Sequence, residues 1–416
     1  MTTTPEENAT LQLVEECARK ILRRHRISPK TAFLTETPLR FLPYDTPDPE
    51  QNSLFKKLDE IAYTLENIIR EHRVCEAVGA LLPPARPFAN LSWLAHNRLM
   101  LIYAMLAHAY FKEKLGYKTI DECKADKIPK ALPPQLAVPL WQLHKITGIE
   151  PSLSYMLYGP GANHYKKDPE GPWEVENLLL LHSFTGGGDE SWFVRTHLGM
   201  EAKSAPAIPD LTTAHVLSLR HDRHQRFIAQ AITNRLFKAA RVGDDVVAIL
   251  KRMREHCDYR TYFQKVRLFY AFPSLVIFDG VPELAGKALS ILGETGGMAA
   301  LKHTLLACAG IDHDDDPYFP AMRKHMPRPF RNFILHIKKT TRIREFVLAE
   351  LERGNQEPAK AYNAFLQSFI LNWDMVHDGL VKDFIVRFGD GHGTGGTPIP
   401  WLQGLYEKRK TFLVAL

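Results

Sequence analysis

Apolar residues recur every three or four positions wherever this 416-residue chain shows a readable pattern. This spacing brings them onto one face of an α-helix. It is clear in residues 54–68, 236–250 and 366–384. Residues 274–278 are the exception because they have the composition of a strand, but this segment is too isolated to build a sheet. The sequence therefore predicts an all-α fold.

Proline-rich stretches at 43–49, 83–87 and 129–139 are predicted to divide the first third of the chain into short helical pieces, with longer helices following from Leu178. Because 45% of the residues are hydrophobic, a chain of this length can bury more than one core. We expect a smaller N-terminal helical domain over 1–184. A larger C-terminal helical domain over 185–416 would carry a mobile glycine-rich loop at 389–397.

The charge balance and the N-terminal segment exclude several classes of protein. A formal charge of +6 permits acidic partners without requiring nucleic acid, and we predict no nucleic-acid partner. The N-terminal segment carries Glu6 and Glu7 and lacks the apolar run of a secretory signal. The longest apolar run, 99–111, is too short to span a bilayer, so we predict a buried helix there and no membrane association. The five cysteines are dispersed without a CxxC pair, which favours the cytoplasm.

One predicted helix, 362–388, places an imidazole inside an apolar stripe. Leu366, Phe369, Trp373, Leu380 and other apolar residues share the face on which His377 lies. One interpretation is a core histidine bonded to a backbone carbonyl. The other is an axial ligand to a flat apolar cofactor such as haem, which needs a rigidly held imidazole. The spacing alone leaves both open.

Residues 391–396 match the GxGxxG pattern of dinucleotide-binding proteins, but their context excludes that fold. Pro398 and Pro400 follow directly, and the 20 residues after Gly396 leave no room for the second strand. Two interpretations remain open. The segment is either a lid whose Thr394 and Thr397 contact a ligand, or a simple connector.

Basic residues in two places also allow two interpretations. Arg267 lies among apolar neighbours, which predicts either a buried salt bridge or a fork for a substrate carboxylate. Eight Lys or Arg without an acidic residue lie between 323 and 344; a solvated helical face or contacts to haem propionates would explain them.

His221, Asp222 and His224 are more typical of an exposed helix start than of a metal site.

Several segments, in their order and rough spacing, resemble the indoleamine 2,3-dioxygenase family, and the resemblance covers most of the chain. These segments are Tyr165–Pro169, Glu176–Asn177, Ser183–Gly186, Tyr262–Arg267, Gly293–Gly297, Met326–Phe333, Arg344–Leu348 and Gly393–Thr397.

The resemblance implies a two-domain, all-helical haem protein. Members insert both atoms of O2 across the C2–C3 bond of the tryptophan indole and form N-formylkynurenine. For this chain it implies haem b as cofactor, O2 as co-substrate and L-tryptophan or a related indole amino acid as substrate. His377 matches the proximal iron ligand, and Thr295 and Gly296 match the turn against the distal face of the haem.

The resemblance also implies a set of residues around the substrate. Arg267 corresponds to the guanidinium that grips the substrate carboxylate, and Thr394 to the loop residue that meets the ammonium. The aromatic residues correspond to the walls around the indole. The whole set is Tyr155, Phe193, Tyr262, Phe263, Arg267, Thr394 and Gly395.

Three positions depart from the family pattern. Counting back from Glu201 places His197 where vertebrate members carry a serine, and we predict that it acts catalytically at the indole NH, as the distal histidine of tryptophan 2,3-dioxygenases does. A slip of one residue would place Thr196 there instead, and His197 would then be a histidine on the helix surface. The segment around Asp374 lacks the arginine that some members use to bind a propionate, which leaves a residue of the basic stretch or water for that role. Tyr262 replaces a more usual phenylalanine, and its hydroxyl needs a partner.

Other functions stay open at this point. One is an enzyme of the same fold that oxidises or rearranges a modified tryptophan in secondary metabolism. A non-catalytic sensor of haem or tryptophan is another, although a sensor would not need the lid. A helical scaffold without haem is the third. The sequence does not indicate an oligomeric state.

Overall fold

The computed structural model describes residues 4–83, 88–220 and 225–416, and nearly all of their regular structure is helical. This confirms the all-α class. The four strands of the described part have three residues each: β1 (Lys130–Leu132), β2 (His164–Lys166), β3 (Leu178–Leu180) and β4 (Val276–Phe278). The α-helices of the first half are α1 (Pro5–Arg24), α2 (Pro49–Arg70), α3 (Val74–Gly79), α4 (Trp93–Leu115), α5 (Ile120–Ala125), α6 (Pro134–Thr147), α7 (Gly188–Ser204) and α8 (Ala207–Ser218). Those of the second half are α9 (Gln225–Lys251), α10 (Met253–His256), α11 (Tyr259–Thr261), α12 (Ala300–Cys308), α13 (Tyr318–Lys324), α14 (Arg328–Thr340), α15 (Ile343–Glu352), α16 (Glu357–Leu366), α17 (Asn372–Phe384) and α18 (Ile399–Lys410).

The prediction of short helices in the first third is wrong. Helices α1, α2 and α4 contain 20, 22 and 23 residues. Pro5, Pro49 and Pro134 each stand in the first turn of a helix, where the missing N–H costs nothing. These prolines therefore mark where helices begin rather than where they are interrupted. Residues 84–87 of the second proline-rich stretch lie outside the described residues.

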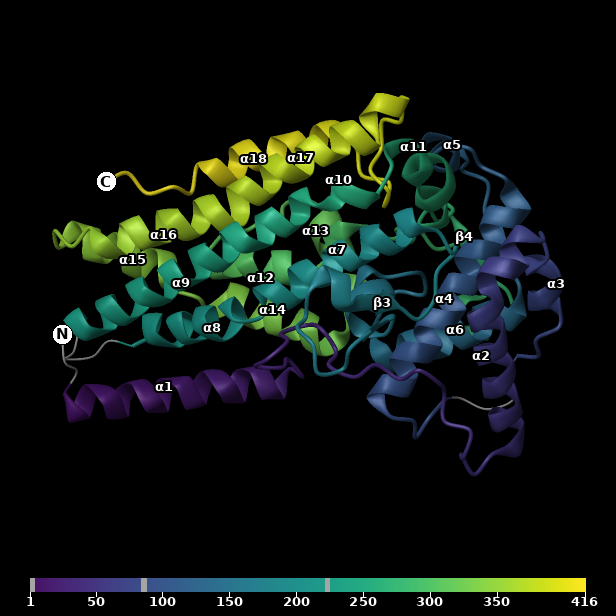
Figure 1. The fold of residues 1–416 in the computed structure, drawn as a ribbon, viewed down its shortest axis with the longest axis horizontal. Helices are drawn as coiled ribbons and strands as arrows, with labels where there is room; N and C mark the ends of the chain where they lie inside the picture. Colours follow the sequence, from purple (N-terminus) through teal and green to yellow (C-terminus); the bar gives the residue numbers. More distant parts are fainter. Residues whose placement is uncertain (1–3, 84–87, 221–224) are drawn as a thin grey trace.

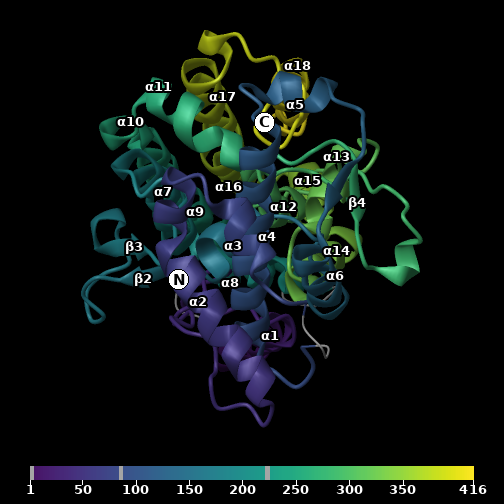
Figure 2. The ribbon, with the colours of Figure 1, turned by 90° about the vertical axis from the view of Figure 1, so that its right-hand side faces the viewer.

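Helix α4 forms the centre of the N-terminal part. Residues 95–111 are buried without a break, as the apolar run predicts. Ser92 caps the helix through a bond from the Ala95 N–H, and Gly116 ends it in the left-handed conformation at φ 65°. Helices α2, α3 and α6 pack on α4, and Figure 2 views the molecule from this end.

Helix α9 is the longest of the described helices and organises the C-terminal part. It packs against α7, α8, α16 and α17, which lie along it in Figure 1. Gly243 allows one close approach because a Cβ at this position would lie 2.9 Å from the backbone of Phe369. The core of this part therefore lies around α9, with α7 and α8 as well as the helices of the last 60 residues packed against it.

The predicted division at residue 184 is not reflected in every contact. Helix α1 packs along α8 and α14 of the C-terminal part, away from α2, α3 and α4 (Figure 1). The strand predicted at 274–278 pairs in parallel with β1 over three residues. A pair of strands thus joins the two parts, and the domain boundary stays a prediction.

The predicted helix 362–388 is built from four consecutive helical segments. They are α16, the π-helical turn η7 (Gln367–Leu371), α17 and the 3₁₀ turn η8 (Val386–Phe388). A π turn inserts one extra residue and changes which side chains share a face. The turn lies directly before the helix that carries His377.

None of the described helices is long and apolar enough to cross a membrane. Each of the five cysteines carries a free thiol.

Buried histidines make the stability of the fold sensitive to acid. In eight of them burial lowers the pKa from 6.5 to about 3 or 4: His108, His164, His182, His197, His215, His303, His313 and His325. Below pH 6.5 these histidines bind protons in the unfolded chain but stay unprotonated in the folded chain. The free energy of unfolding therefore falls as the pH falls. Burial also raises the pKa of Glu201 and Glu294 to about 8, which works in the opposite direction between pH 8 and 4.5.

Because eight groups outweigh two, we expect the melting temperature to fall as the pH is lowered from 6.5 to 5. Each histidine can contribute up to about 1.4 kcal/mol per pH unit. Thermal denaturation from pH 8 to 4.5 measures the effect. A melting temperature that is constant or rises between pH 6.5 and 5 would show that these histidines are protonated in the fold.

Candidate functional site

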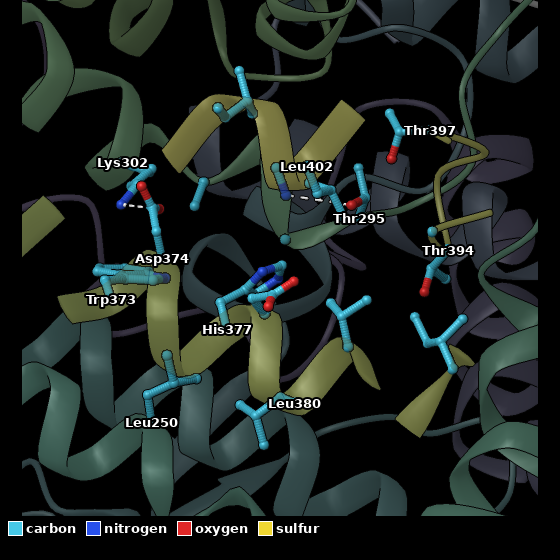
Figure 3. A pocket seen from close by; sticks show the side chains of 18 of the residues that line it. Leu250, Thr295, Lys302, Trp373, Asp374, His377, Leu380, Thr394, Thr397 and Leu402 are labelled. Atoms are coloured by element: carbon cyan, nitrogen blue, oxygen red, sulfur yellow. Dashed lines mark hydrogen bonds and ion pairs between the residues drawn. The ribbon is translucent and has the colours of Figure 1, made fainter. Parts of the chain in front are cut away.

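A cavity of about 570 Å³ lies between the C-terminal helices and α7. Its walls come from α7, α9, α10, α12, α13, α17 and α18, from the π-helical turn η3 (Tyr262–Val266) and from the loop 389–397. Figure 3 shows the part of it that His377, Leu250 and Leu380 line on one side and Thr295, Thr394 and Thr397 on the other. Most of the lining is apolar, with a few polar groups, as is typical of ligand and cofactor sites.

His377 points into this cavity from α17 (Figure 3). In the described part of the chain, neither a side chain nor a backbone carbonyl forms a hydrogen bond with its ring, so the predicted alternative of a core histidine bonded to a carbonyl does not hold here. Burial lowers the pKa of His377, which keeps the imidazole neutral at pH 7. A neutral imidazole with an open nitrogen can ligate a metal.

His197 lies on α7 and lines the same cavity. Its Nδ1 donates to the carbonyl of Phe193 at 2.8 Å, which leaves Nε2 as an acceptor. Burial, and to a lesser extent the positive charge that His377 can carry, lower the pKa of His197 to about 4. The adjacent Thr196 is turned away, because it is fully buried and donates to the carbonyl of Trp192 at 2.8 Å. The alternative with Thr196 at the cavity is therefore not what the structure adopts.

The helical spacing of α7 explains how one element serves both the cavity and its support. Phe193, His197 and Met200 share the face that lines the cavity. One position further, Glu201 accepts a hydrogen bond of 3.1 Å from the hydroxyl of Tyr155, which also lines the cavity. Burial raises the pKa of Glu201 to about 8, so this carboxyl is protonated at pH 7.

Aromatic rings form one end of the cavity. The rings of Phe193 and Tyr262 lie 4.6 Å apart, and those of Phe193 and His197 lie 4.7 Å apart. The Tyr262 hydroxyl finds the partner it needs in Thr394. Phe263, in contrast, does not line the cavity and stacks on Phe388 at 4.8 Å.

The loop 389–397 lies over the cavity with its threonines inward. Thr394 and Thr397 line the cavity, whereas Gly395 packs against Thr295 so closely that a Cβ would lie 2.7 Å from Cγ2 of that residue. Thr295 itself caps the turn of Gly296, and both residues line the cavity. The loop is therefore seated by specific contacts, which a simple connector would not need.

Arg267 does not reach the cavity in this structure. It is fully buried, donates from Nη1 to the Asp390 carboxylate and from Nη2 to the carbonyl of His392, and its Nε has no partner among the described residues. Of the two predicted interpretations, the buried salt bridge is the one observed. The role of Arg267 toward a substrate carboxylate stays a prediction.

A cluster of charges that the sequence analysis missed lines the other end of the cavity. Asp374, one turn before His377, lies 2.9 Å from Nζ of Lys302 and 2.7 Å from Nη1 of Arg409 (Figure 3 shows Asp374 and Lys302). All three side chains line the cavity and are at most 13% exposed. Burial lowers the pKa of Lys302 to about 8, which is still above pH 7, so Lys302 is mostly protonated. With Arg409 and Asp374 the cluster then carries a net positive charge. It can attract an anionic group in the cavity.

The other predicted cations do not join this site. None of residues 323–344 lines the cavity; Arg323 and Lys338, for example, pair with Asp314 instead. The prediction that a residue of this stretch contacts a propionate is therefore not supported by its position. His221, Asp222 and His224 lie outside the described residues.

The sequence is similar to known proteins over most of its length. The chain matches the family model described as indoleamine 2,3-dioxygenase over residues 21–396. It is 28% identical to indoleamine 2,3-dioxygenase 1 of Rattus norvegicus, over 96% of this chain and 97% of the rat protein. It is 24% identical to indoleamine 2,3-dioxygenase of Saccharomyces cerevisiae, over 79% and 72%. It is also 23% identical to 6-hydroxytryptophan 2,3-dioxygenase of Fusarium equiseti, over 53% and 54%.

Proposed function

The chain belongs to the indoleamine 2,3-dioxygenase family, and we propose that it is a haem-dependent dioxygenase acting on L-tryptophan. It would insert both atoms of O2 across the indole C2–C3 bond and release N-formylkynurenine. The observation that supports this most is the unbonded ring of His377, which lines one cavity together with His197, Phe193 and Tyr262.

The residues present fit haem b. His377 would bind the iron, because its ring faces the cavity without another partner. The apolar walls suit the macrocycle, and Lys302 and Arg409 would hold its carboxylates. When bound, haem supplies the iron chemistry that activates O2.

The other residues of the cavity would bind and orient the indole amino acid. Phe193 and Tyr262 offer aromatic faces for the indole, and Nε2 of His197 would accept a hydrogen bond from the indole N–H. Thr394 lies beside Tyr262, where it would meet the ammonium group. Arg267 would take the carboxylate once it is free of Asp390. The protein's contribution is then mainly to position the indole amino acid.

A second candidate is a modified tryptophan as substrate. The relative from Fusarium equiseti carries the name of a 6-hydroxytryptophan enzyme, and both His197 and the Tyr262 hydroxyl make this cavity polar at its aromatic end. The kcat/KM values for L-tryptophan and 6-hydroxy-L-tryptophan, measured side by side, decide between the two substrates.

Mass spectrometry of the product tests the reaction. Haem-loaded, ascorbate-reduced protein is mixed with L-tryptophan under ¹⁸O-labelled O2. A product that carries both labelled atoms supports the dioxygenase. A product with one labelled atom would point to a monooxygenase. A spectral shift with tryptophan but no product would point to a sensor.

The substitution His197→Ser tests the contact to the indole N–H. We expect a lower preference for L-tryptophan over 1-methyl-L-tryptophan, by roughly 2- to 10-fold, because one neutral hydrogen bond is lost. Turnover of both substrates measures the ratio. Thr196→Ala is the matched control, because this neighbour points away from the cavity. An unchanged ratio in His197→Ser would contradict the contact.

The substitution Lys302→Met tests the cation cluster. Removing its charge leaves Asp374 and Arg409 as a neutral pair, so we expect haem to dissociate about 10-fold or more faster. Transfer of haem to an excess of apomyoglobin measures the rate. Lys382→Met is the control, because Lys382 also lines the cavity but is 58% exposed and pairs with Asp378. Equal rates in both variants would show that Lys302 does not contact haem.

A further inference from the structure

The buried ion pair between Arg267 and Asp390 joins the centre of the protein to the loop over the cavity. Both side chains are 0% exposed, although they are 123 residues apart in the sequence. The same guanidinium also binds the carbonyl of His392. Two loop residues therefore occupy both terminal amino groups of Arg267, and only Nε stays without a partner in the described part of the chain.

The segment 390–392 is held from a second side by α5. The Asp390 carboxylate accepts hydrogen bonds from the backbone N–H groups of Ile120 and Asp121 at 3.0 and 3.1 Å. The Asp121 carboxylate in turn accepts from the Gly391 N–H at 3.0 Å and lies 2.7 Å from Nδ1 of His392. Asp121 thus seats the same segment without touching Arg267.

The next residues of the loop face the cavity. Thr394 and Thr397 line it, and the Gly393 N–H donates to the Thr397 carbonyl at 2.7 Å. Only three residues separate Asp390 from Thr394, so a shift of Asp390 would also move Thr394. The ion pair and the cavity wall belong to one short segment.

Asp390 occupies Nη1 of Arg267 and the His392 carbonyl occupies Nη2, so an incoming carboxylate can take both terminal groups of the guanidinium only by displacing these two partners. We propose that Asp390 is an internal carboxylate that occupies Arg267 in the ligand-free protein and is exchanged for the carboxylate of the incoming amino acid. This rests on the proposed function for the identity of the ligand. The exchange makes Asp390 a residue that determines specificity. An indole amino acid must displace Asp390 before it can bind Arg267, which costs free energy. An indole amine has no carboxylate and leaves the ion pair between Arg267 and Asp390 intact.

The surroundings of Asp390 suit such an exchange. Burial and the neighbouring Asp121 raise the pKa of Asp390, although Arg267 acts in the opposite direction. Once Arg267 turns to another carboxylate, the Asp390 carboxyl can take a proton rather than stay as an isolated buried charge. The released segment also carries Gly389 and Gly396, both at positive φ, on either side.

Binding measurements on the haem-loaded protein test the exchange. Isothermal titration calorimetry gives the dissociation constants of L-tryptophan and of tryptamine, which lacks the carboxylate. We expect the dissociation constant of L-tryptophan to be lower in Asp390→Asn than in the wild type by about 5-fold or more, because no internal carboxylate has to leave. The dissociation constant of tryptamine should stay within about 2-fold of the wild-type value. Asp121→Asn is the matched control, because it loosens the loop without freeing Arg267, and its ratio of the two constants should equal that of the wild type.

Hydrogen exchange of the backbone amides of 389–393 gives an independent readout. In the wild type, saturating L-tryptophan should raise the exchange of this segment and tryptamine should not; in Asp390→Asn the exchange should be high without ligand. Should Asp390→Asn not fold, Asp390→Ala replaces it. An unchanged ratio of dissociation constants in the Asp390 variant, or the same change in Asp121→Asn, overturns the proposal.

The two proposals fail separately. If the product carries both labelled atoms but the ratio of the two dissociation constants is unchanged in Asp390→Asn, the exchange is overturned and the dioxygenase stands. A carboxylate-selective shift in Asp390→Asn without labelled product would remove the dioxygenase and leave the exchange. If neither ligand binds, both are overturned.

Discussion

His377→Ala is expected to give a folded protein that does not retain haem. His377 is the one imidazole on α17, its ring faces the cavity, and no described side chain bonds to it. The iron would therefore lose its protein ligand, whereas the fold loses no hydrogen bond. Absorption spectra after reconstitution and gel filtration measure the haem content, and circular dichroism checks the fold. We expect less than about a tenth of the wild-type haem.

His303→Gln is the control for this variant. His303 also lines the cavity, but its Nε2 contacts the Gly297 carbonyl at 2.9 Å, so its ring is already engaged. This variant should retain haem. Addition of free imidazole should restore haem binding to His377→Ala by supplying the missing ligand. Full haem content with unchanged spectra in His377→Ala would mean that another residue binds the iron.

What could be predicted from the sequence is what local spacing controls. The apolar positions of 54–68 and 366–384 predict helices because their side chains recur with the helical period, and α2, α16 and α17 lie there. The single His377 in an apolar stripe was a visible candidate for the same reason. The position of His197 at the cavity follows from the period of α7, once its register is known.

What could not be predicted depends on contacts between distant segments. Lys302, Asp374 and Arg409 come from α12, α17 and α18, and no spacing rule brings them together. Lys302, the one Lys or Arg of helix α12, was the only available signal. Asp390 gave no signal at all, because its partner Arg267 precedes it by 123 residues. The prolines misled because a proline begins a helix as readily as it breaks one.

Arg267→Ala is expected to abolish the discrimination between L-tryptophan and tryptamine. A charge-assisted bond between a guanidinium and a carboxylate contributes about 1.5–3 kcal/mol, which corresponds to roughly 10- to 150-fold in the dissociation constant of L-tryptophan. Tryptamine has no carboxylate, so its dissociation constant should stay near that of the wild type. Calorimetric titration of both ligands gives the two constants, and the ratio isolates the carboxylate from any general damage to the cavity.

Arg267→Ala also removes the ion-pair partner of Asp390. Comparison of this variant with Asp390→Asn therefore distinguishes loss of the contact to the ligand carboxylate from loosening of the loop. In Arg267→Ala the loop segment 390–392 loses its bonds to the guanidinium but keeps those to Asp121 and Ile120. In Asp390→Asn the guanidinium remains while its internal partner loses its charge. The two variants should therefore move the tryptophan constant in opposite directions, weaker in Arg267→Ala and tighter in Asp390→Asn. If both weaken it, Asp390 and Arg267 act together as a support for the loop; if Arg267→Ala weakens both ligands equally, the substrate carboxylate is bound elsewhere.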